Sequence, residues 1–124
     1  MFEKGKIKGV VDDISKNLKG IDKVILFGSA ARSEKYEDID LLVVYKNAPD
    51  LNLLNEICNK MVKEKRYNFR IQHILDYDTL SLMPSEKNDS REIHLLHSNK
   101  KELIISQHPI VNNIANDGIV LYSN

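Results

Sequence analysis

The sequence predicts a single α/β (α+β) domain, residues 1–124, in which a small mixed sheet is flanked by helices. Short apolar runs bounded by turn residues alternate with longer stretches whose apolar residues recur at helical spacing. No repeat, low-complexity tract or Pro- and Gly-rich linker divides the chain. A chain of this length buries roughly two-thirds of its unfolded surface, which is enough for a core without disulfides or metals.

The first half of the chain is expected to hold two amphipathic helices, a short helix that begins at Ala30, and two strands. Apolar residues follow helical spacing over residues 3–19 and again over residues 51–65. Residues 23–27 and 38–45 are apolar runs typical of short strands. The second run is apolar at consecutive positions, so we expect both of its faces to be covered.

The middle of the chain predicts one more strand and a short helix. Residues 69–75 (FRIQHIL) are typical of a strand. Asp76 or Asp78 could cap a short helix that ends at Leu82. Residues 84–90 are polar and are expected to form a loop.

The last third is predicted to be mostly helical. Residues 91–107 are read as a helix with a break at Ser98–Asn99. Pro109 suits the first turn of a further helix. Asp117–Gly118 would end that helix, and residues 119–122 are expected to form a final strand.

Composition narrows the class of protein. Lys plus Arg and Asp plus Glu are 18 each, so the formal net charge of zero argues against a free-standing nucleic-acid binder. A local basic patch leaves nucleic acid open as a partner.

Cys58 is the only cysteine, no apolar run approaches a membrane span of about 20 residues, and the start has no signal-peptide core. We therefore expect a cytoplasmic protein with no membrane contact.

Two carboxylates stand at the start of the second expected strand. Asp38 and Asp40 are two residues apart, so their side chains share one face at a separation of about 6.6 Å. At an effective dielectric constant of 20, two such charges repel by about 2.5 kcal/mol. Exposure of both to water would relieve this repulsion. A divalent cation such as Mg²⁺ between them would relieve it too, because hard cations prefer carboxylate oxygens.

A Gly-Ser pair follows the first expected strand. Ser29 can cap a short helix that begins at Ala30, so free backbone N–H groups and the positive end of a helix dipole would converge there. Gly28 would let a bulky group approach the backbone, which makes the turn suited to phosphate. An ordinary serine-capped turn is the alternative. If the two strands are neighbours, a nucleoside triphosphate with Mg²⁺ is the natural occupant of both features.

The stretch Gly28-Ser29-x8-Asp38-x-Asp40 resembles the DNA-polymerase-β-like nucleotidyltransferase superfamily. It is most similar to the minimal nucleotidyltransferases of bacteria and archaea, some of which are antitoxin partners of HEPN-domain toxins. The tail PIVNNIANDGIVLY is similar to the helix, glycine and strand that close many small members. The resemblance implies a polymerase-β-like nucleotidyltransferase fold.

The resemblance also implies an activity. The protein would be a Mg²⁺-dependent enzyme that transfers a nucleoside monophosphate from a nucleoside triphosphate, with ATP the expected donor, to a hydroxyl group. Asp38 and Asp40 would be the catalytic, metal-binding residues. Gly28, Ser29 and Arg32 would bind the nucleotide. The acceptor would be a partner protein such as a HEPN-type toxin, an RNA end or a small molecule, and a homodimer is also implied.

The sequence departs from the family pattern in three places. The connector before Asp38 is short, and Ser33 replaces the usual glycine after Ala31-Arg32. Active members carry a third carboxylate in an apolar-Asp-apolar-apolar run on a later strand. The matching run here, residues 71–74, places Gln72 at that position, and a glutamine amide cannot accept a proton at neutral pH.

Two consequences follow from Gln72. Asp76 lies on the same strand face and would replace the missing acid only if the strand bends, whereas His73 should point to the opposite face. The alternative function is therefore a catalytically weak or inactive member that acts as a nucleotide-binding module or an antitoxin-type protein-binding module.

His94 and His97 are three residues apart, but no third ligand supports a zinc site on a shared helix face.

Overall fold

The fold consists of one sheet with three described helices. The computed structural model describes residues 4–28, 39–46, 50, 51–64, 67–75, 79–82, 92–105 and 118–123. The elements in chain order are α1 (Lys4–Asn17), β1 (Ile21–Phe27), β2 (Ile39–Tyr45), α3 (Leu51–Lys63), β3 (Asn68–His73), β4 (Thr79–Leu82), β5 (Glu92–Asn99), α4 (Lys100–Ile105) and β6 (Ile119–Ser123).

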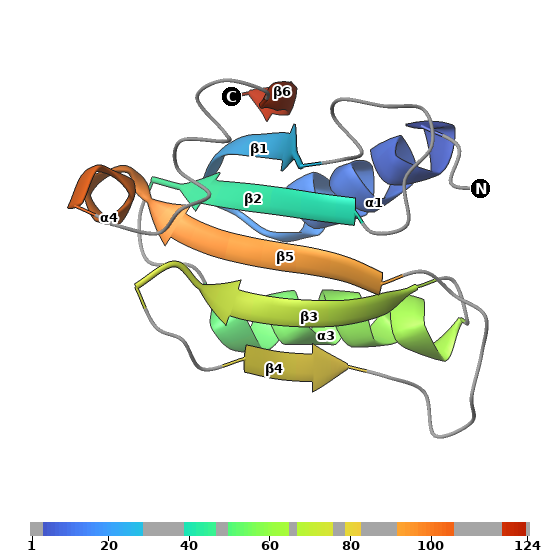
Figure 1. The fold of residues 1–124 in the computed structure, drawn as a ribbon. Helices are drawn as coiled ribbons and strands as arrows, with labels where there is room; N and C mark the ends of the chain where they lie inside the picture. Colours follow the sequence, from blue (N-terminus) through green and yellow to red (C-terminus); the bar gives the residue numbers. More distant parts are fainter. Residues whose placement is uncertain are drawn as a thin grey trace.

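The six strands form one mixed sheet in the order β4-β3-β5-β2-β1-β6 (Figure 1). The central strands β3, β5 and β2 are parallel to one another, whereas β1 is antiparallel to β2 and β6, and β4 is antiparallel to β3. The last long strand, β5, therefore inserts between β2 and β3. This arrangement confirms the predicted mixed α/β architecture.

Apolar side chains fill both faces of the sheet. The larger cluster joins α1 and α3 to one face, and these helices lie behind the sheet in Figure 1. The smaller cluster lies on the other face. The four consecutive residues 41–44 of β2 are all buried, because alternate members point into the two clusters. The predicted two-sided burial of this strand is confirmed.

The helix α3 begins at Leu51, as its sequence predicts, and ends at Lys63, two residues before the predicted end. Asp50 caps its first turn, since the backbone N–H of Leu53 donates to Asp50 Oδ1 at 3.1 Å. Its buried face includes Leu54, Cys58 and Met61. Cys58 belongs to the core, and burial raises the pKa of its thiol to about 12.

Two predicted helices are wrong. Residues 92–99 form β5, and only the six residues of α4 that follow are helical. Because β5 is central and buried on both faces, its apolar residues do not alternate, and such a run resembles a helix segment. Residues 79–82 form β4, which pairs with β3 instead of forming a capped helix. The predicted break at 98–99 does coincide with the end of β5.

Other expectations lie outside the described residues: the short helix from Ala30, the loop over 84–90 and the helix from Pro109. The final strand is described as β6, as predicted. Among the helices that the structure describes, none has the length and apolar character needed to span a membrane.

Candidate functional site

The ends of β1 and β2 bring Gly28 against Asp40. Phe27, the last residue of β1, pairs with Asp40 in β2, so the two predicted strands are neighbours. Gly28 has φ +75°, and a Cβ atom built on it would lie 2.5 Å from Asp40 Oδ2. Glycine is therefore required twice, once for its backbone angle and once for the room that Asp40 occupies. Ser29, Arg32 and Asp38 lie outside the described residues.

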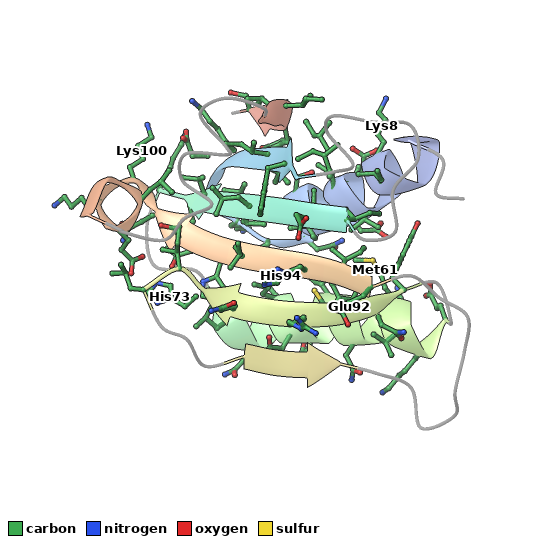
Figure 2. The ribbon with its side chains drawn as sticks, viewed as in Figure 1. Lys8, Met61, His73, Glu92, His94 and Lys100 are labelled. Carbon is green, nitrogen blue, oxygen red and sulfur yellow. The ribbon has the colours of Figure 1, made fainter. Side chains whose placement is uncertain are left out.

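His94 is the neighbour of Asp40 on the next strand. Asp40 of β2 pairs with His94 of β5, and His94 pairs with Arg70 of β3, so the three side chains share one face of the sheet. His94 Nδ1 lies 3.5 Å from Asp40 Oδ1, and both side chains are 25% exposed. Figure 2 shows His94 on the sheet face turned away from α3.

Gln72 reaches the same histidine from the far side. Its Oε1 atom lies 3.3 Å from His94 Nε2, so a row of contacts runs from Asp40 through His94 to Gln72. The alternation of β3 turns His73 to the opposite face, as the sequence predicts. Asp76 lies outside the described residues.

The position inferred for Gln72 needs correction. Gln72 is not on the strand next to β2, because β5 lies between β2 and β3. The side chain beside Asp40 is His94, in the run Ile93-His94-Leu95-Leu96 of β5. This run has the apolar-x-apolar-apolar pattern throughout, whereas residues 71–74 have the polar His73 at the third position. It was missed because residues 91–107 were read as a helix.

An ion pair adjoins this row. Arg70 Nη2 lies 3.2 Å from Glu92 Oε1, and both side chains are substantially exposed. Arg70 is in register with His94. The same face of the sheet therefore carries an acid, a histidine and an ion pair within three neighbouring strands.

The donor atoms of this row fit a divalent cation. Asp40 offers carboxylate oxygens beside a turn that has no Cβ atom, and magnesium sites commonly combine one or two carboxylates with substrate phosphates and water. Within the described ranges, no three His, Cys, Asp or Glu side chains converge closely enough to hold an ion by themselves. Further ligands would have to come from Asp38, outside those ranges, or from substrate.

A second polar cluster lies on the opposite face of the sheet, toward the C-terminal ends of β2, β3 and β5. Glu102 of α4 accepts a hydrogen bond from the Tyr45 hydroxyl at 3.3 Å and contacts His73 Nε2 at 2.5 Å. Tyr45 also contacts His97 Nδ1 at 3.5 Å, and the rings of His73 and His97 have centroids 5.1 Å apart. These four side chains, Tyr45, His73, His97 and Glu102, are called the His97 cluster below.

Burial governs ionisation in the His97 cluster. Burial, followed by the nearby His73, lowers the pKa of His97 to about 4, against the opposing effect of Glu102. Burial and then Glu102 raise the pKa of Tyr45 to about 12. Sequence reasoning missed this cluster, although one signal was present. Asn99 and Glu102 have the spacing of a capping box, and each side chain accepts a hydrogen bond from the other's backbone N–H at 2.7 and 3.2 Å.

Solved structures with a similar fold include toxin–antitoxin complexes. A double mutant of the MntA–HpeT complex has a chain that is 15% identical, with a TM-score of 0.54 and coverage of 99% of this chain and 75% of that one. A single mutant of the same complex has a chain that is 17% identical, with a TM-score of 0.56 and coverage of 100% of this chain and 75% of that one. A toxin–antitoxin structure with AMP-PNP has a chain that is 16% identical, with a TM-score of 0.55 and coverage of 99% of this chain and 75% of that one. At these identities the likeness concerns the fold.

Comparison with curated proteins finds no match to this chain. The family model described as polymerase beta, nucleotidyltransferase, matches residues 10–94, which is more than half of the chain. The matched region contains Gly28, Asp40 and Gln72, and it ends at His94. The chain therefore belongs to the polymerase beta nucleotidyltransferase family.

Proposed function

We propose that the protein is a metal-dependent nucleotidyltransferase that moves a nucleoside monophosphate from a nucleoside triphosphate, with ATP the expected donor, to a hydroxyl acceptor. One observation carries the proposal. The turn at Gly28 packs directly against the Asp40 carboxylate, so a phosphate-binding turn and a cation-binding acid would act on one ligand. Membership of the nucleotidyltransferase family supports the reaction class.

Each residue has a proposed role. Asp40, together with Asp38, would hold the cation, for which Mg²⁺ is the first candidate. Gly28 and Ser29 would hold the β- and γ-phosphates, and Arg32 would contact a phosphate as a planar donor. A bound cation would offset the negative charge that develops on the phosphate oxygens.

The proposed reaction is a single displacement at phosphorus. The acceptor oxygen forms a bond to the α-phosphorus while the bond from that phosphorus to the bridging oxygen breaks. Pyrophosphate leaves, and the hydroxyl proton is released to solvent. The site residues would act by orienting the triphosphate for this in-line attack.

The proposed acceptor is a hydroxyl group on a partner toxin. Structures of similar fold include a toxin–antitoxin pair with AMP-PNP, an analogue of ATP. The MntA–HpeT double mutant carries glutamate in place of two aspartates that are two residues apart, which is also the spacing of Asp38 and Asp40. These parallels support a nucleotide substrate and a toxin partner, for which a HEPN-type protein is the first candidate.

The contact between His94 and Asp40 favours a second candidate function. A histidine, and not a carboxylate, lies beside Asp40. The site therefore offers a cation one carboxylate fewer than it would if an acid stood at this position. The protein would then act as a nucleotide-binding or antitoxin-type protein-binding module without turnover.

Label transfer from [α-³²P]ATP distinguishes the two candidates. The protein is incubated with a co-purifying partner from its native host and either Mg²⁺ or Mn²⁺, and label on protein or RNA is measured together with pyrophosphate release. We expect transfer by the wild type and by Asp12→Asn, a matched exposed acid on α1. Asp38→Asn and Asp40→Asn should lower transfer at least about a hundredfold.

Calorimetric titration of metal–ATP completes the design. Nucleotide binding by the wild type without label transfer, together with a stoichiometric partner, would favour the binding module. Full transfer by Asp40→Asn would rule out the proposed enzyme site.

A further inference from the structure

The contact between Gln72 and His94 favours one tautomer of the neutral imidazole ring. It joins His94 Nε2 to Gln72 Oε1, an amide oxygen that can only accept a hydrogen bond. In the tautomer that suits this contact, Nε2 carries the proton and donates a hydrogen bond to Gln72. The other nitrogen, Nδ1, then presents its lone pair toward Asp40 Oδ1 at 3.5 Å.

Two hydrogen-bond acceptor atoms that face each other are stabilised by a cation between them. The carboxylate oxygen and the Nδ1 lone pair are both electron-rich, so their approach is unfavourable without a proton or a metal ion. Metal bonds to histidine nitrogen and carboxylate oxygen are about 2.0–2.2 Å long, which separates adjacent ligand atoms by about 3.0–3.5 Å. The observed separation of 3.5 Å suits two ligands of one ion.

We propose that His94 is a nitrogen ligand of the cation at Asp40, and that the site consequently favours Mn²⁺ over Mg²⁺. The inference rests on the proposed function, because it concerns the cation that would hold the nucleotide. Mg²⁺ takes oxygen ligands almost exclusively. Among the divalent first-row metals, Mn²⁺ shares the preference for carboxylate oxygen and is also the first of the series whose affinity for mixed nitrogen and oxygen sites rises toward Cu²⁺. Mn²⁺ accepts both donors and the triphosphate oxygens.

Gln72 is the positioning residue of this arrangement. Metal-bound histidines usually donate their other ring N–H to a carbonyl or carboxylate, which holds the tautomer and the ring orientation. The contact from His94 Nε2 to Gln72 Oε1 has this form. The glutamine that seemed to mark a missing acid would therefore support the metal ligand on the neighbouring strand.

Pulsed electron paramagnetic resonance of bound Mn²⁺ tests the nitrogen ligand directly. Mn²⁺ is added to the full chain, with and without AMP-PNP, using protein grown with natural or ¹⁵N-labelled histidine. We expect nitrogen modulation that changes with the ¹⁵N label and disappears in His94→Gln. His73→Gln is the matched control, since His73 and His94 have the same side-chain exposure of 25%, and its signal should persist.

Metal selectivity supplies the second measurement. The ratio of the Mg²⁺ to the Mn²⁺ dissociation constant should fall at least about tenfold in His94→Asp, because an oxygen ligand replaces nitrogen. Gln72→Leu should weaken Mn²⁺ binding about tenfold, and Gln72→Glu, which retains an acceptor, should restore it. An unchanged ratio in His94→Asp would overturn the inference.

The outcomes separate this inference from the proposed function. Mn²⁺ binding that depends on Asp40 but shows no histidine nitrogen would overturn the role of His94 and leave the nucleotidyltransferase site intact. If neither Mn²⁺ nor metal–nucleotide binds to the wild type, both proposals fail together. The labelled wild type shows whether any histidine nitrogen binds the ion, and His94→Asp is a second variant at the same position, so failure of His94→Gln to fold does not block the test.

Discussion

Two histidines of β5, three residues apart, belong to clusters of opposite character. His94 points to the face that carries Asp40 and Gln72, whereas His97 points to the other face, in the His97 cluster. His94 is 25% exposed in its side chain and His97 only 5% overall. Figure 2 labels His94 and His73, which represent the two clusters at separate places along the sheet.

The difference separates a binding site from a structural network. In the His97 cluster, Glu102 accepts hydrogen bonds from the Tyr45 hydroxyl and from the backbone N–H of Asn99, and it also contacts His73 Nε2. These contacts attach α4 to the ends of the strands. In the His94 row, an acid and a ring nitrogen face each other and remain accessible to solvent. Burial with satisfied partners favours stability, whereas a partly exposed acid beside a ring nitrogen favours binding.

The largest predicted change in the free energy of unfolding is a pH dependence that comes from His97. Its folded-state pKa of about 4 lies below the ordinary 6.5, so between these values the unfolded chain binds more protons. Its contribution is therefore complete above about pH 6.5 and is lost as the pH falls toward 4, by roughly 2–3 kcal/mol. Urea denaturation between these pH values measures the loss.

The matched control for this pH effect is His97→Gln. This variant should flatten the acid side of the stability profile, because its side chain does not titrate. Equal slopes in the wild type and His97→Gln would show that other groups govern acid stability.

Alanine at the two histidines compares their packing. His97→Ala would leave a cavity and remove a buried partner of Tyr45, so we expect a loss of about 2 kcal/mol in the free energy of unfolding. His94→Ala should cost less than about 1 kcal/mol, because its side chain is partly solvated. Denaturation at neutral pH provides both values. A larger loss at His94 would reverse our assignment of the structural role.

Two glycines with the same backbone strain sharpen the assignment of the binding face. Gly20 has φ +85° with open space at its Cβ position, whereas Gly28 has φ +75° and meets Asp40. Alanine at either should cost about 1–2 kcal/mol through the left-handed backbone. Only Gly28→Ala should also displace the Asp40 carboxylate and weaken metal–nucleotide binding in calorimetry. Equal binding by both variants would place the ligand elsewhere.

The exposed ion pair of Arg70 and Glu92 should contribute least to the free energy of unfolding. Its side chains are 49% and 35% exposed, so Arg70→Gln should change the free energy of unfolding by less than about 0.5 kcal/mol. The change should shrink further as salt is added. A loss above about 1 kcal/mol in denaturation would indicate that this pair is coupled to His94.

Local signals in the sequence determined several elements and half of the candidate site. Helical spacing identified α1 and α3, because one apolar stripe on each must pack on the sheet. The run into Gly28 and the run from Asp40 identified β1 and β2. Their antiparallel pairing brought the glycine to the acid, as the neighbouring-strand hypothesis required. These features depend on periodicity and turn chemistry within a few residues.

Only the tertiary structure decided what lies beside Asp40. Residues 93–96 follow the apolar-x-apolar-apolar pattern fully and residues 71–74 follow it only in part, but neither run by itself says which strand adjoins β2. Strand order depends on long-range pairing, which placed β5 between β2 and β3 and so brought His94, not Gln72, next to the acid. The same burial on both faces that makes β5 central also removed the alternation by which a strand is recognised.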